Sequence, residues 1–174
     1  MLQRVEMKIP KQRIAIAIGK KGEVKKQIEE TTKTKIEIDS KTGTAIIEGE
    51  PQNTVIAQDI VKAIARGFSP EKAMLLAEPE YMLDIIELRD WVNSENAAKV
   101  KRARVIGRKG SAREKIEEKT NCFLSVQGKT ISIIGHVEDI EKARKAVEML
   151  LSGASHKKTF AELDRMLMRR SFRL

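Results

Sequence analysis

Apolar and polar residues alternate along the chain with two different periods, and these periods divide it into strands and helices. In the first third, three segments alternate with period two, which is typical of half-buried strands. In three others, apolar residues recur every three or four positions, which is typical of amphipathic helices. The predicted strands are 5–10, 35–39 and 44–49, and the predicted helices are 11–18, 23–32 and 53–67. The order is strand, helix, helix, strand, strand, helix.

The same order of elements recurs in the second half of the chain. When the sequence is shifted on itself by 88 residues, Gly19 falls on Gly107 and Gly22 falls on Gly110. The second set of predicted strands is 81–88, 122–126 and 130–135, and the second set of helices is 94–106, 111–120 and 137–153. Self-similarity of this kind indicates a tandem of two copies of one domain.

We therefore expect an α+β fold with two tandem domains, each packing three helices against a three-stranded sheet. The predicted parts are a first domain in 1–67, a bridging helix in 68–80, a second domain in 81–154 and a C-terminal amphipathic helix in 155–174. Ser69 and Pro70 are typical of a helix start and Pro79 of a helix end, so we expect a short helix there that packs against a domain.

The C-terminal segment has the pattern of an amphipathic helix with its own start signal. Thr159 and Glu162 have the spacing of a capping box. An apolar stripe accompanies it, formed by Phe160, Leu163, Met166 and Leu167. One interpretation is that this helix packs on its own domain. The other is a docking helix for a protein partner that brings three cations near RNA: Arg169, Arg170 and Arg173.

The two halves of the chain differ in net charge. Residues 1–88 hold 14 Lys and Arg and 14 Asp and Glu, whereas residues 89–174 hold 20 and 11, so the net charge of +9 lies in the second half. Within it, residues 99–115 hold eight cations and one acid. A concentrated basic field predicts a polyanionic partner. Aromatic residues make up only 3% of the chain, which argues against RNA binding by rows of exposed rings.

The cysteine count and the hydropathy pattern bear on the compartment. Cys122 is the only cysteine, so no intramolecular disulfide forms and a reducing compartment is the expected setting. No apolar run approaches the roughly 18 residues of a membrane span. We expect a cytoplasmic protein without a membrane partner.

The glycine pairs stand at turns between two helices, and they carry the candidate chemistry. Glycine lets the backbone approach a ligand closely, because no side chain stands in the way. The helix that follows each turn aims free N–H groups and its positive dipole end into the same space. Phosphate is the anion that suits this geometry, with Lys20 and Lys21, or Arg108 and Lys109, adding charge.

The recurrence of G-x-x-G behind an apolar residue, with an amphipathic helix and an alternating strand after it, resembles the KH domain in both copies. Only 18 residues precede the first G-x-x-G, which fits the eukaryotic-type (type I) order of elements. This resemblance implies that the turn clamps the backbone of about four single-stranded nucleotides beside an apolar groove for bases. The residues that it implies in the second copy are Ala103, Arg104, Ile106, Gly107, Arg108, Lys109, Gly110, Arg113, Leu124 and Val126.

The first copy has matching positions, but we expect it to bind RNA weakly or to dock a protein instead. The matching residues are Ile18, Gly19, Lys20, Lys21, Gly22, Lys25, Ile36 and Ile38. Acidic residues lie near these loop cations, and the first half of the chain is neutral. Many KH domains have an aliphatic residue where Lys25 and Arg113 stand, so the resemblance implies that a cation takes part in base selection here.

The whole chain also resembles the archaeal form of the Partner of NOB One family of ribosome-assembly proteins. The segments that carry this resemblance are "KIPKQRIAIAIGKKG", "ARGFSPEKAMLLAEPEYMLDIIEL", "VKRARVIGRKGSAREKIEE" and "GKTISIIG". It implies binding to the single-stranded 3′ end of small-subunit (16S) rRNA or its precursor. It also implies two protein partners, the NOB endonuclease and the alpha subunit of translation initiation factor two.

Other functions remain open at this point. The KH surfaces are also compatible with a protein-interaction scaffold for a nuclease or initiation factor, or with an exosome-type or messenger-RNA binder. An enzyme is not expected, because no catalytic constellation, metal site or cofactor motif is present. The two histidines are far apart, Cys122 is interpreted as a buried thiol, and the Glu29-Glu30 and Glu117-Glu118 pairs as a solvated face.

Overall fold

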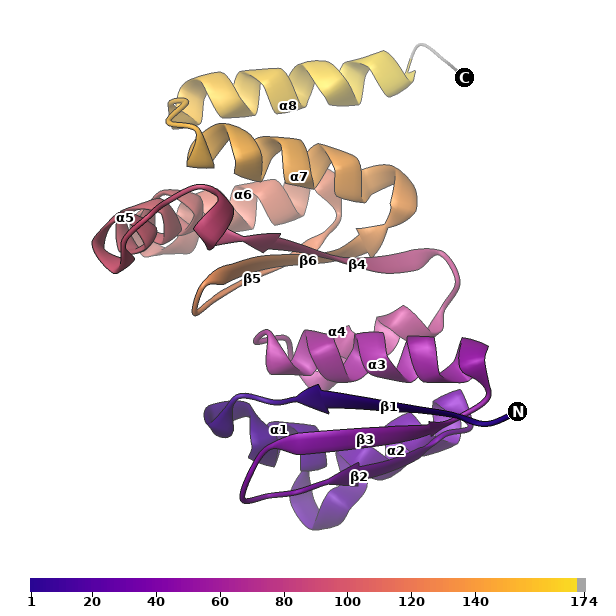
Figure 1. Cartoon of the computed structure of the whole chain (residues 1–174). Helices are drawn as coiled ribbons and strands as arrows, with labels where there is room; N and C mark the ends of the chain where they lie inside the picture. The colour runs from indigo at the N-terminus through magenta and orange to yellow at the C-terminus, as the bar shows by residue number, and fades with distance from the viewer. Residues whose placement is uncertain (172–174) are drawn as a thin grey trace. The chain divides into compact units, whose positions relative to one another are not determined.

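The chain folds into two compact units, Met1–Leu83 and Asp84–Leu174, in a computed structural model that describes residues 1–171 (Figure 1). The division falls inside the fourth strand. Each unit contains one three-stranded sheet and its helices, as the tandem pattern predicts. No helix within the described residues is long and apolar enough to cross a membrane.

The first unit follows the predicted order of elements, with a short helix added at its end. Its strands are β1 (Gln3–Lys8), β2 (Lys35–Ile38) and β3 (Thr44–Gly49), and its helices are α1 (Ile14–Ile18), α2 (Glu23–Thr32), α3 (Pro51–Ala65) and α4 (Pro70–Met74). Single 3₁₀ turns occupy Lys11–Arg13, Lys20–Gly22 and Leu75–Ala77. The antiparallel strand order is β1-β3-β2, so β2 is an edge strand.

Period-two alternation gives the first sheet its buried face. Ile47 of β3 lies opposite Val5 of β1 and Ile36 of β2, and both Ile36 and Ile47 are almost fully buried. Ile28 of α2 is buried as well, because the apolar stripe of that helix packs inward. The bridging helix α4 begins where Ser69 accepts a hydrogen bond from the Lys72 N–H at 3.3 Å. It packs on α3.

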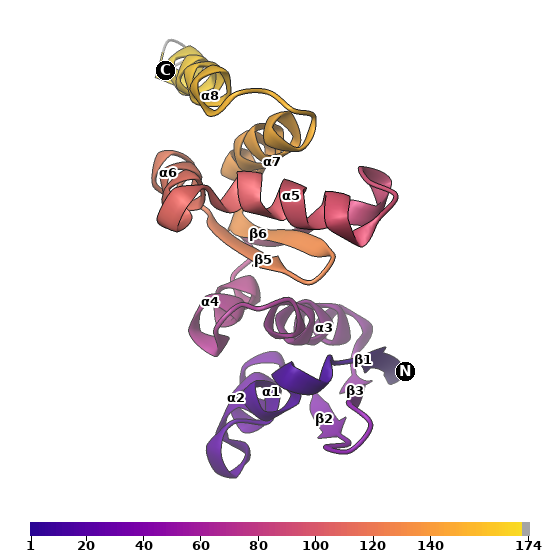
Figure 2. The same ribbon diagram turned by 90° about the vertical axis from the view of Figure 1, so that its left-hand side faces the viewer.

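The second unit repeats this arrangement and adds one long helix. Its strands are β4 (Tyr81–Glu87), β5 (Phe123–Gln127) and β6 (Thr130–His136), and its helices are α5 (Glu95–Ile106), α6 (Ser111–Thr120), α7 (Val137–Leu151) and α8 (His156–Ser171). Single 3₁₀ turns occupy Leu88–Asp90 and Arg108–Gly110. The strand order is β4-β6-β5, and Figure 2 shows α5, α6 and α7 on one face of this sheet. The edge strand β5 is the counterpart of β2.

The core of the second unit is aliphatic. Ile131 and Ile133 of β6 are completely buried, and they belong to one apolar cluster with Ile116 of α6 and Val147 of α7. This agrees with the low aromatic content, since Ile, Val, Leu and Ala can fill a core of this size.

The C-terminal helix packs on its own domain, which confirms one of the two interpretations of that segment. It contacts α7 and α6, and Leu163 is completely buried in the core. The predicted capping box is wrong. The helix begins at His156, where the Lys158 N–H donates to Ser155 Oγ at 3.1 Å, and Thr159 Oγ1 is buried without a hydrogen bond.

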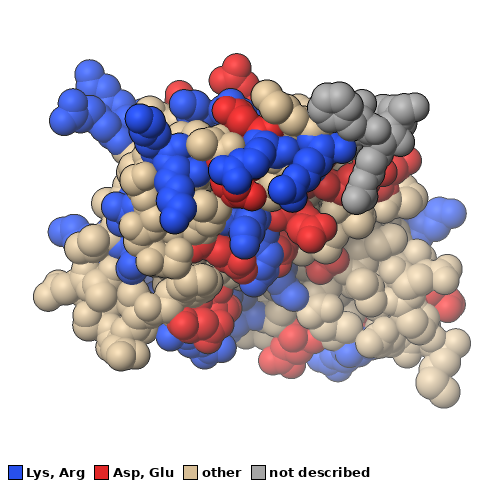
Figure 3. Space-filling view, turned by 90° about the horizontal axis from the view of Figure 1, so that it is seen from above, with Lys and Arg blue, Asp and Glu red and all other residues tan. Residues whose placement is uncertain are grey.

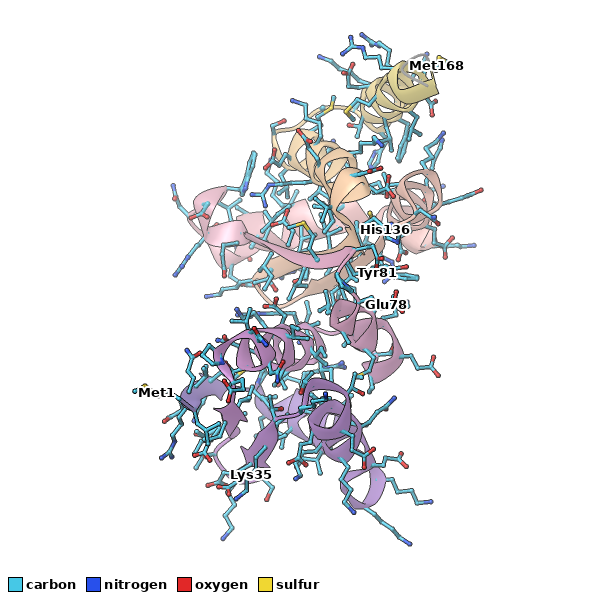
Figure 4. The ribbon with its side chains drawn as sticks, turned by 90° about the vertical axis from the view of Figure 1, so that its right-hand side faces the viewer. Met1, Lys35, Glu78, Tyr81, His136 and Met168 are labelled. Atoms are coloured by element: carbon cyan, nitrogen blue, oxygen red, sulfur yellow. The ribbon has the colours of Figure 1, made fainter. Side chains whose placement is uncertain are left out.

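One face of α8 remains in solvent, as the exposed side chain of Met168 indicates. Met168 lies near the C-terminal end of the helix (Figure 4), and it is 63% exposed. Of the three tail arginines predicted near RNA, the side chain of Arg170 and all of Arg173 lie outside the described residues. Figure 3 shows the face over α8, where Lys and Arg side chains stand among Asp and Glu.

Candidate nucleic-acid interface

The two glycine turns have nearly the same backbone conformation. In the second copy, φ and ψ are 74° and 176° at Gly107, 55° and 30° at Lys109, and 77° and 9° at Gly110. In the first copy, the values at Lys21 are 53° and 28°, and the flanking glycines match in the same way. All of these residues have positive φ, which glycine adopts at little cost and lysine adopts only at some cost. The similarity of the two copies in sequence is therefore matched by the backbone conformation of their turns.

The two glycines of the second turn have different roles. A Cβ atom on Gly107 would lie 2.6 Å from the Cβ of Ala112 and 2.7 Å from its backbone nitrogen, so the turn touches the start of α6 directly. A Cβ on Gly110 would meet no atom within 4 Å. Gly107 is required for packing, whereas Gly110 leaves open space at the start of α6.

This open space has the character of an anion site. Gly110 caps α6 without a side-chain hydrogen bond, so the first N–H groups of the helix point outward. Arg108 and Lys109 are both exposed beside it. A phosphate placed there meets backbone donors, the positive end of the helix dipole and two exposed cations.

The predicted groove residues lie together around α5, α6 and β5, three elements that pack against one another. Ala103 is exposed on α5, and Ile106 is half-buried at the end of that helix. Leu124 has its side chain in the core, with 4% exposed, and Val126 packs against that core from β5. These residues place small and aliphatic side chains of α5 beside the edge of β5, whereas the Leu124 side chain belongs to the core.

Glu117 holds that strand edge in place. Its Oε2 accepts a hydrogen bond from the Leu124 N–H at 3.1 Å, and its Oε1 lies 3.6 Å from Arg113 Nε. Arg113 Nε is buried and makes no hydrogen bond. The interpretation of Glu117 as part of a solvated face is therefore wrong, whereas its neighbour Glu118 is exposed as expected. Helical spacing alone does not show which face meets the edge strand.

The first copy closes the same edge more completely. Glu29 accepts from the Ile36 N–H at 2.9 Å and from Lys25 Nζ at 2.9 Å, and Lys25 also donates to the Ile36 carbonyl at 3.2 Å. Burial acts to raise the pKa of Glu29, but the hydrogen bonds from Ile36 and Lys25 outweigh it and lower the pKa below its ordinary value. Glu29 is thus a structural carboxylate as well, and only Glu30 lies fully in solvent.

The open carbonyl of the second copy is the clearest difference between the two grooves. In an antiparallel edge strand, the N–H and C=O of one residue point to the same side. Within residues 1–171, no side chain donates to the Leu124 carbonyl, whereas the matching Ile36 carbonyl is bonded to Lys25. The second groove therefore retains a free backbone acceptor beside a partly exposed cation, Arg113.

Arg104 does not join the predicted interface. Its Nε donates to the Leu150 carbonyl at 3.2 Å and its Nη2 to the Ala154 carbonyl, so it holds the end of α7. Arg13 does the same for the end of α3, donating to the carbonyls of Ile64 at 2.8 Å and Phe68 at 2.7 Å. The sequence predicts Arg104 as an RNA-binding cation and predicts no structural role for Arg13.

A second arginine of the basic segment also has a structural contact. Arg102 donates to the Gly128 carbonyl at 2.9 Å and to Glu95 at 2.7 Å, which fixes the β5–β6 hairpin to α5. Lys99, Arg108, Lys109 and Lys115 of the same segment are exposed. The cations available to a polyanion are therefore fewer than the sequence count and are concentrated near the turn.

The described residues hold neither a cluster of metal ligands nor an exposed thiol. Within them, no three His, Cys, Asp or Glu side chains are placed to hold a metal ion. Cys122 is buried, and desolvation raises the pKa of its thiol to about 11, which disfavours the nucleophilic thiolate. His156 instead lies with its Nε2 2.8 Å from the Arg104 carbonyl, to which it donates.

Comparison with known proteins matches both copies. Residues 82–167 match the model of the second KH domain of the Partner of NOB One group, described as a eukaryotic-type, type I KH domain. Residues 4–63 match the KH domain. A KH domain-containing protein of Methanocaldococcus jannaschii is 46% identical over 164 residues, which cover 91% of this chain and 72% of that protein.

Solved structures are similar over nearly the whole chain. Dim2p from Pyrococcus horikoshii OT3 is 46% identical with a TM-score of 0.87, covering 94% of this chain and 99% of that one. A protein of unknown function from Aeropyrum pernix is 35% identical with a TM-score of 0.93, covering 99% and 95%. The crystal structure of an a/eIF2alpha–aDim2p–rRNA complex from P. horikoshii OT3 contains a chain 46% identical, with a TM-score of 0.88, covering 95% and 94%.

Two glycine turns of matching geometry, the type I order of elements in each unit and these similarities lead to one conclusion: the chain belongs to the archaeal Partner of NOB One family of tandem KH-domain proteins, which includes Dim2p.

Proposed function

We propose that this protein binds the single-stranded 3′ end of small-subunit (16S) rRNA, or of its precursor, during maturation of the subunit. The observation that carries the proposal is the second glycine turn, where exposed Arg108 and Lys109 flank open space at the start of α6. A relative of this chain was solved in a complex with rRNA, which supports RNA as the polyanion.

In this proposal, the turn and the groove do different work. The turn positions backbone phosphates, which fixes the register of the strand without reading its sequence. The free Leu124 carbonyl and the Arg113 guanidinium lie beside the groove, where they offer one acceptor and one set of donors to a base edge. Base preference therefore comes from the groove and affinity comes largely from the turn.

A salt series tests this division. The purified chain is titrated with RNAs that match the 3′ end of small-subunit rRNA and with scrambled RNAs of the same length. We expect preference for the rRNA end to persist as salt rises. For single strands, the slope of log K against log salt also counts the phosphate contacts, since each contact contributes about 0.7 to its magnitude. Equal binding of both RNAs at every salt concentration would contradict the proposed function.

Charge reversal tests which copy binds. We expect Arg108→Asp with Lys109→Asp to reduce affinity by about a hundredfold or more, because each of the two lost charged contacts is worth roughly 1.5–3 kcal/mol. Lys20→Asp with Lys21→Asp is the matched control, since the first turn has the same geometry but a closed strand edge. Equal losses from the two double variants would remove the asymmetry from the proposal.

A protein-binding role for the first copy is the second candidate. The solved complex of a relative contains a/eIF2alpha together with aDim2p and rRNA, which favours the alpha subunit of translation initiation factor two as a partner. We also propose the NOB endonuclease, because the family resemblance implies it. Titration calorimetry with each purified partner tests both. RNA binding that survives charge reversal of the second turn would make this scaffold role the main function.

We infer, in addition, a non-catalytic role in the cytoplasm. The KH fold of both units supports a binder, and a buried, unpaired Cys122 agrees with a reducing compartment. Incubation of end-labelled precursor RNA with the chain alone tests the first point, since any cleavage would show that it acts on the RNA itself.

A further inference from the structure

A cavity lies at the second glycine turn, on the side of α6 away from the predicted groove. It has a volume of about 370 Å³, and its walls come from the turn, the first turns of α6 and the start of α8. Ser111 and Lys115 line it, and each is two residues from Arg113, which places them about 160° around α6 from the groove side. The cavity and the predicted groove therefore lie on opposite sides of α6.

The start of α8 is fixed beside this cavity by a specific contact. His156 Nε2 donates to the Arg104 carbonyl at 2.8 Å, which satisfies a carbonyl in the last turn of α5. Phe160 lies one turn later on the same face of α8, and the two ring centroids are 6.4 Å apart. The hydrogen bond from His156 to α5 thus fixes the start of α8, and Phe160 lines the cavity from the same face of that helix.

The side chains around the cavity combine cations with one aromatic ring. Lys115 Nζ lies 4.4 Å from the centroid of the Phe160 ring, and Arg108 reaches the same cavity from the turn. No carboxylate lines it among the described residues. In contrast, the larger groove between α7 and α8 is lined by Glu138, Glu141, Glu148 and Glu162 as well as by cations, which does not suit a polyanion.

Cations without carboxylates, beside an aromatic face, are the features that bind a nucleotide. An ammonium and a guanidinium bind the phosphate, and the ring stacks with the base without regard to its identity. Lys115 has a flexible stem and no ion pair within residues 1–171, so it can turn from the ring to a phosphate while a base takes its place.

We propose that this cavity is a nucleotide subsite that extends the single-stranded RNA path beyond the glycine turn. It takes one nucleotide that flanks the four held by the turn and the groove, with its phosphate at Arg108 and Lys115 and its base on Phe160. The proposal rests on the proposed RNA-binding function. It adds α8 to the RNA-binding surface of the second domain.

The test uses the full chain and RNAs of four to eight nucleotides, in both the rRNA-end and the scrambled sequence, with 2-aminopurine at each position in turn. Phe160→Leu keeps the apolar volume but removes the stacking face. We expect it to lower the affinity for the longer RNAs about tenfold, since stacking is worth roughly 1–3 kcal/mol per base. We also expect quenching at one flanking position to be lost.

The matched control is Lys158→Gln, because Lys158 is exposed on α8 about 160° away from Phe160, on the side that lines another pocket. It should leave affinity and quenching at every length within about twofold of the unmodified chain. Lys115→Gln should reduce the salt slope by about 0.7 for the longer RNAs only.

Three outcomes would overturn the subsite. They are no gain in affinity beyond four nucleotides, an equal loss at every length in Phe160→Leu, and binding of free adenosine monophosphate with no gain from the RNA chain. A length-dependent loss in the scrambled RNAs together with no preference for the rRNA end would support the subsite while contradicting the proposed function. The two proposals therefore fail separately.

Discussion

Substitution of Gly107 by alanine separates the packing role of this glycine from that of its partner in the turn. At Gly107, φ is +74° and ψ is 176°, a combination that is nearly restricted to glycine. The new Cβ would lie 2.7 Å from the Ala112 backbone nitrogen, which cannot move without shifting the start of α6. At Gly110, φ is +77° and ψ is 9°, and no atom lies within 4 Å of a new Cβ.

The expected costs follow from these two environments. Backbone strain at Gly107 costs about 1–3 kcal/mol, and overpacking against α6 adds about 1–3 kcal/mol. The lower entropy of the unfolded alanine variant offsets about 0.4–1 kcal/mol of this. We therefore expect Gly107→Ala to lower the free energy of unfolding by about 3 kcal/mol. At Gly110 only the left-handed strain of about 1–2 kcal/mol applies, so the net loss is about 1 kcal/mol.

Urea unfolding followed by tryptophan emission measures both losses. Trp91 is the only tryptophan, and it lies in the second unit, so its signal follows the domain that contains the turn. With a slope of about 1–3 kcal/mol per molar urea, Gly107→Ala should lower the midpoint by about 1 M or more. Gly110→Ala should lower it by less than half as much. Equal shifts would show that the contact with Ala112 does not determine the requirement for glycine.

Three further substitutions or measurements test single contacts. Glu29→Gln should lower the free energy of unfolding by about 1–2 kcal/mol at pH 7, because the charged carboxylate holds β2. Because the folded pKa of Glu29 is lowered, the stabilisation by its carboxylate is fully present above the ordinary pKa of 4.5 and is lost as pH falls through the folded pKa. A difference in stability between the two proteins that persists in acid would contradict this role of the carboxylate. Cys122, with a pKa of about 11, should react with a disulfide reagent only after unfolding, and fast reaction of the native chain would be inconsistent with its burial. Arg104→Gln should lower the free energy of unfolding by about 1–3 kcal/mol, because it removes the bonds to the Leu150 carbonyl of α7 and to the Ala154 carbonyl just after it, while RNA affinity changes less than about twofold. A large loss of affinity in a stable variant would return Arg104 to the interface.

The sequence predicts the elements and the turns because both depend on local signals. Period-two segments become β2 and β3, and the glycine pairs recur at the same register in both copies. The start of α8 is not predictable in this way, since Ser155 and Thr159 are both suitable caps. The helix starts after Ser155, where His156 donates a hydrogen bond to the Arg104 carbonyl, and these two residues are 52 positions apart in the sequence.

The candidate site is predictable in its turn but not in its surroundings. Arg104 and Arg108 look alike in a count of cations, yet one reaches the end of α7 and the other lies in solvent. Glu117 follows the same helical spacing as a surface residue, and only the packing of α6 against β5 brings its carboxylate to the Leu124 N–H. Partners that are distant in sequence decide these roles, and a single sequence does not specify which partners meet.

The difference between the two grooves comes down to the chemistry of one aligned position, Lys25 against Arg113. A lysine ammonium is compact and donates in several directions, so Lys25 donates to Glu29 and to the Ile36 carbonyl at the same time. A guanidinium is planar and its donors are fixed in one fork, and Arg113 stays 3.6 Å from Glu117 without reaching the strand. The lysine copy thus satisfies its own strand edge, whereas the arginine copy leaves the Leu124 carbonyl and Arg113 Nε without an internal hydrogen bond. Because a bound base must replace any internal bond that it breaks, a strand with a free carbonyl binds RNA at lower cost than a closed one. The basic field around Arg108 and the open edge at Leu124 therefore favour the same domain, although they arise from separate parts of the sequence.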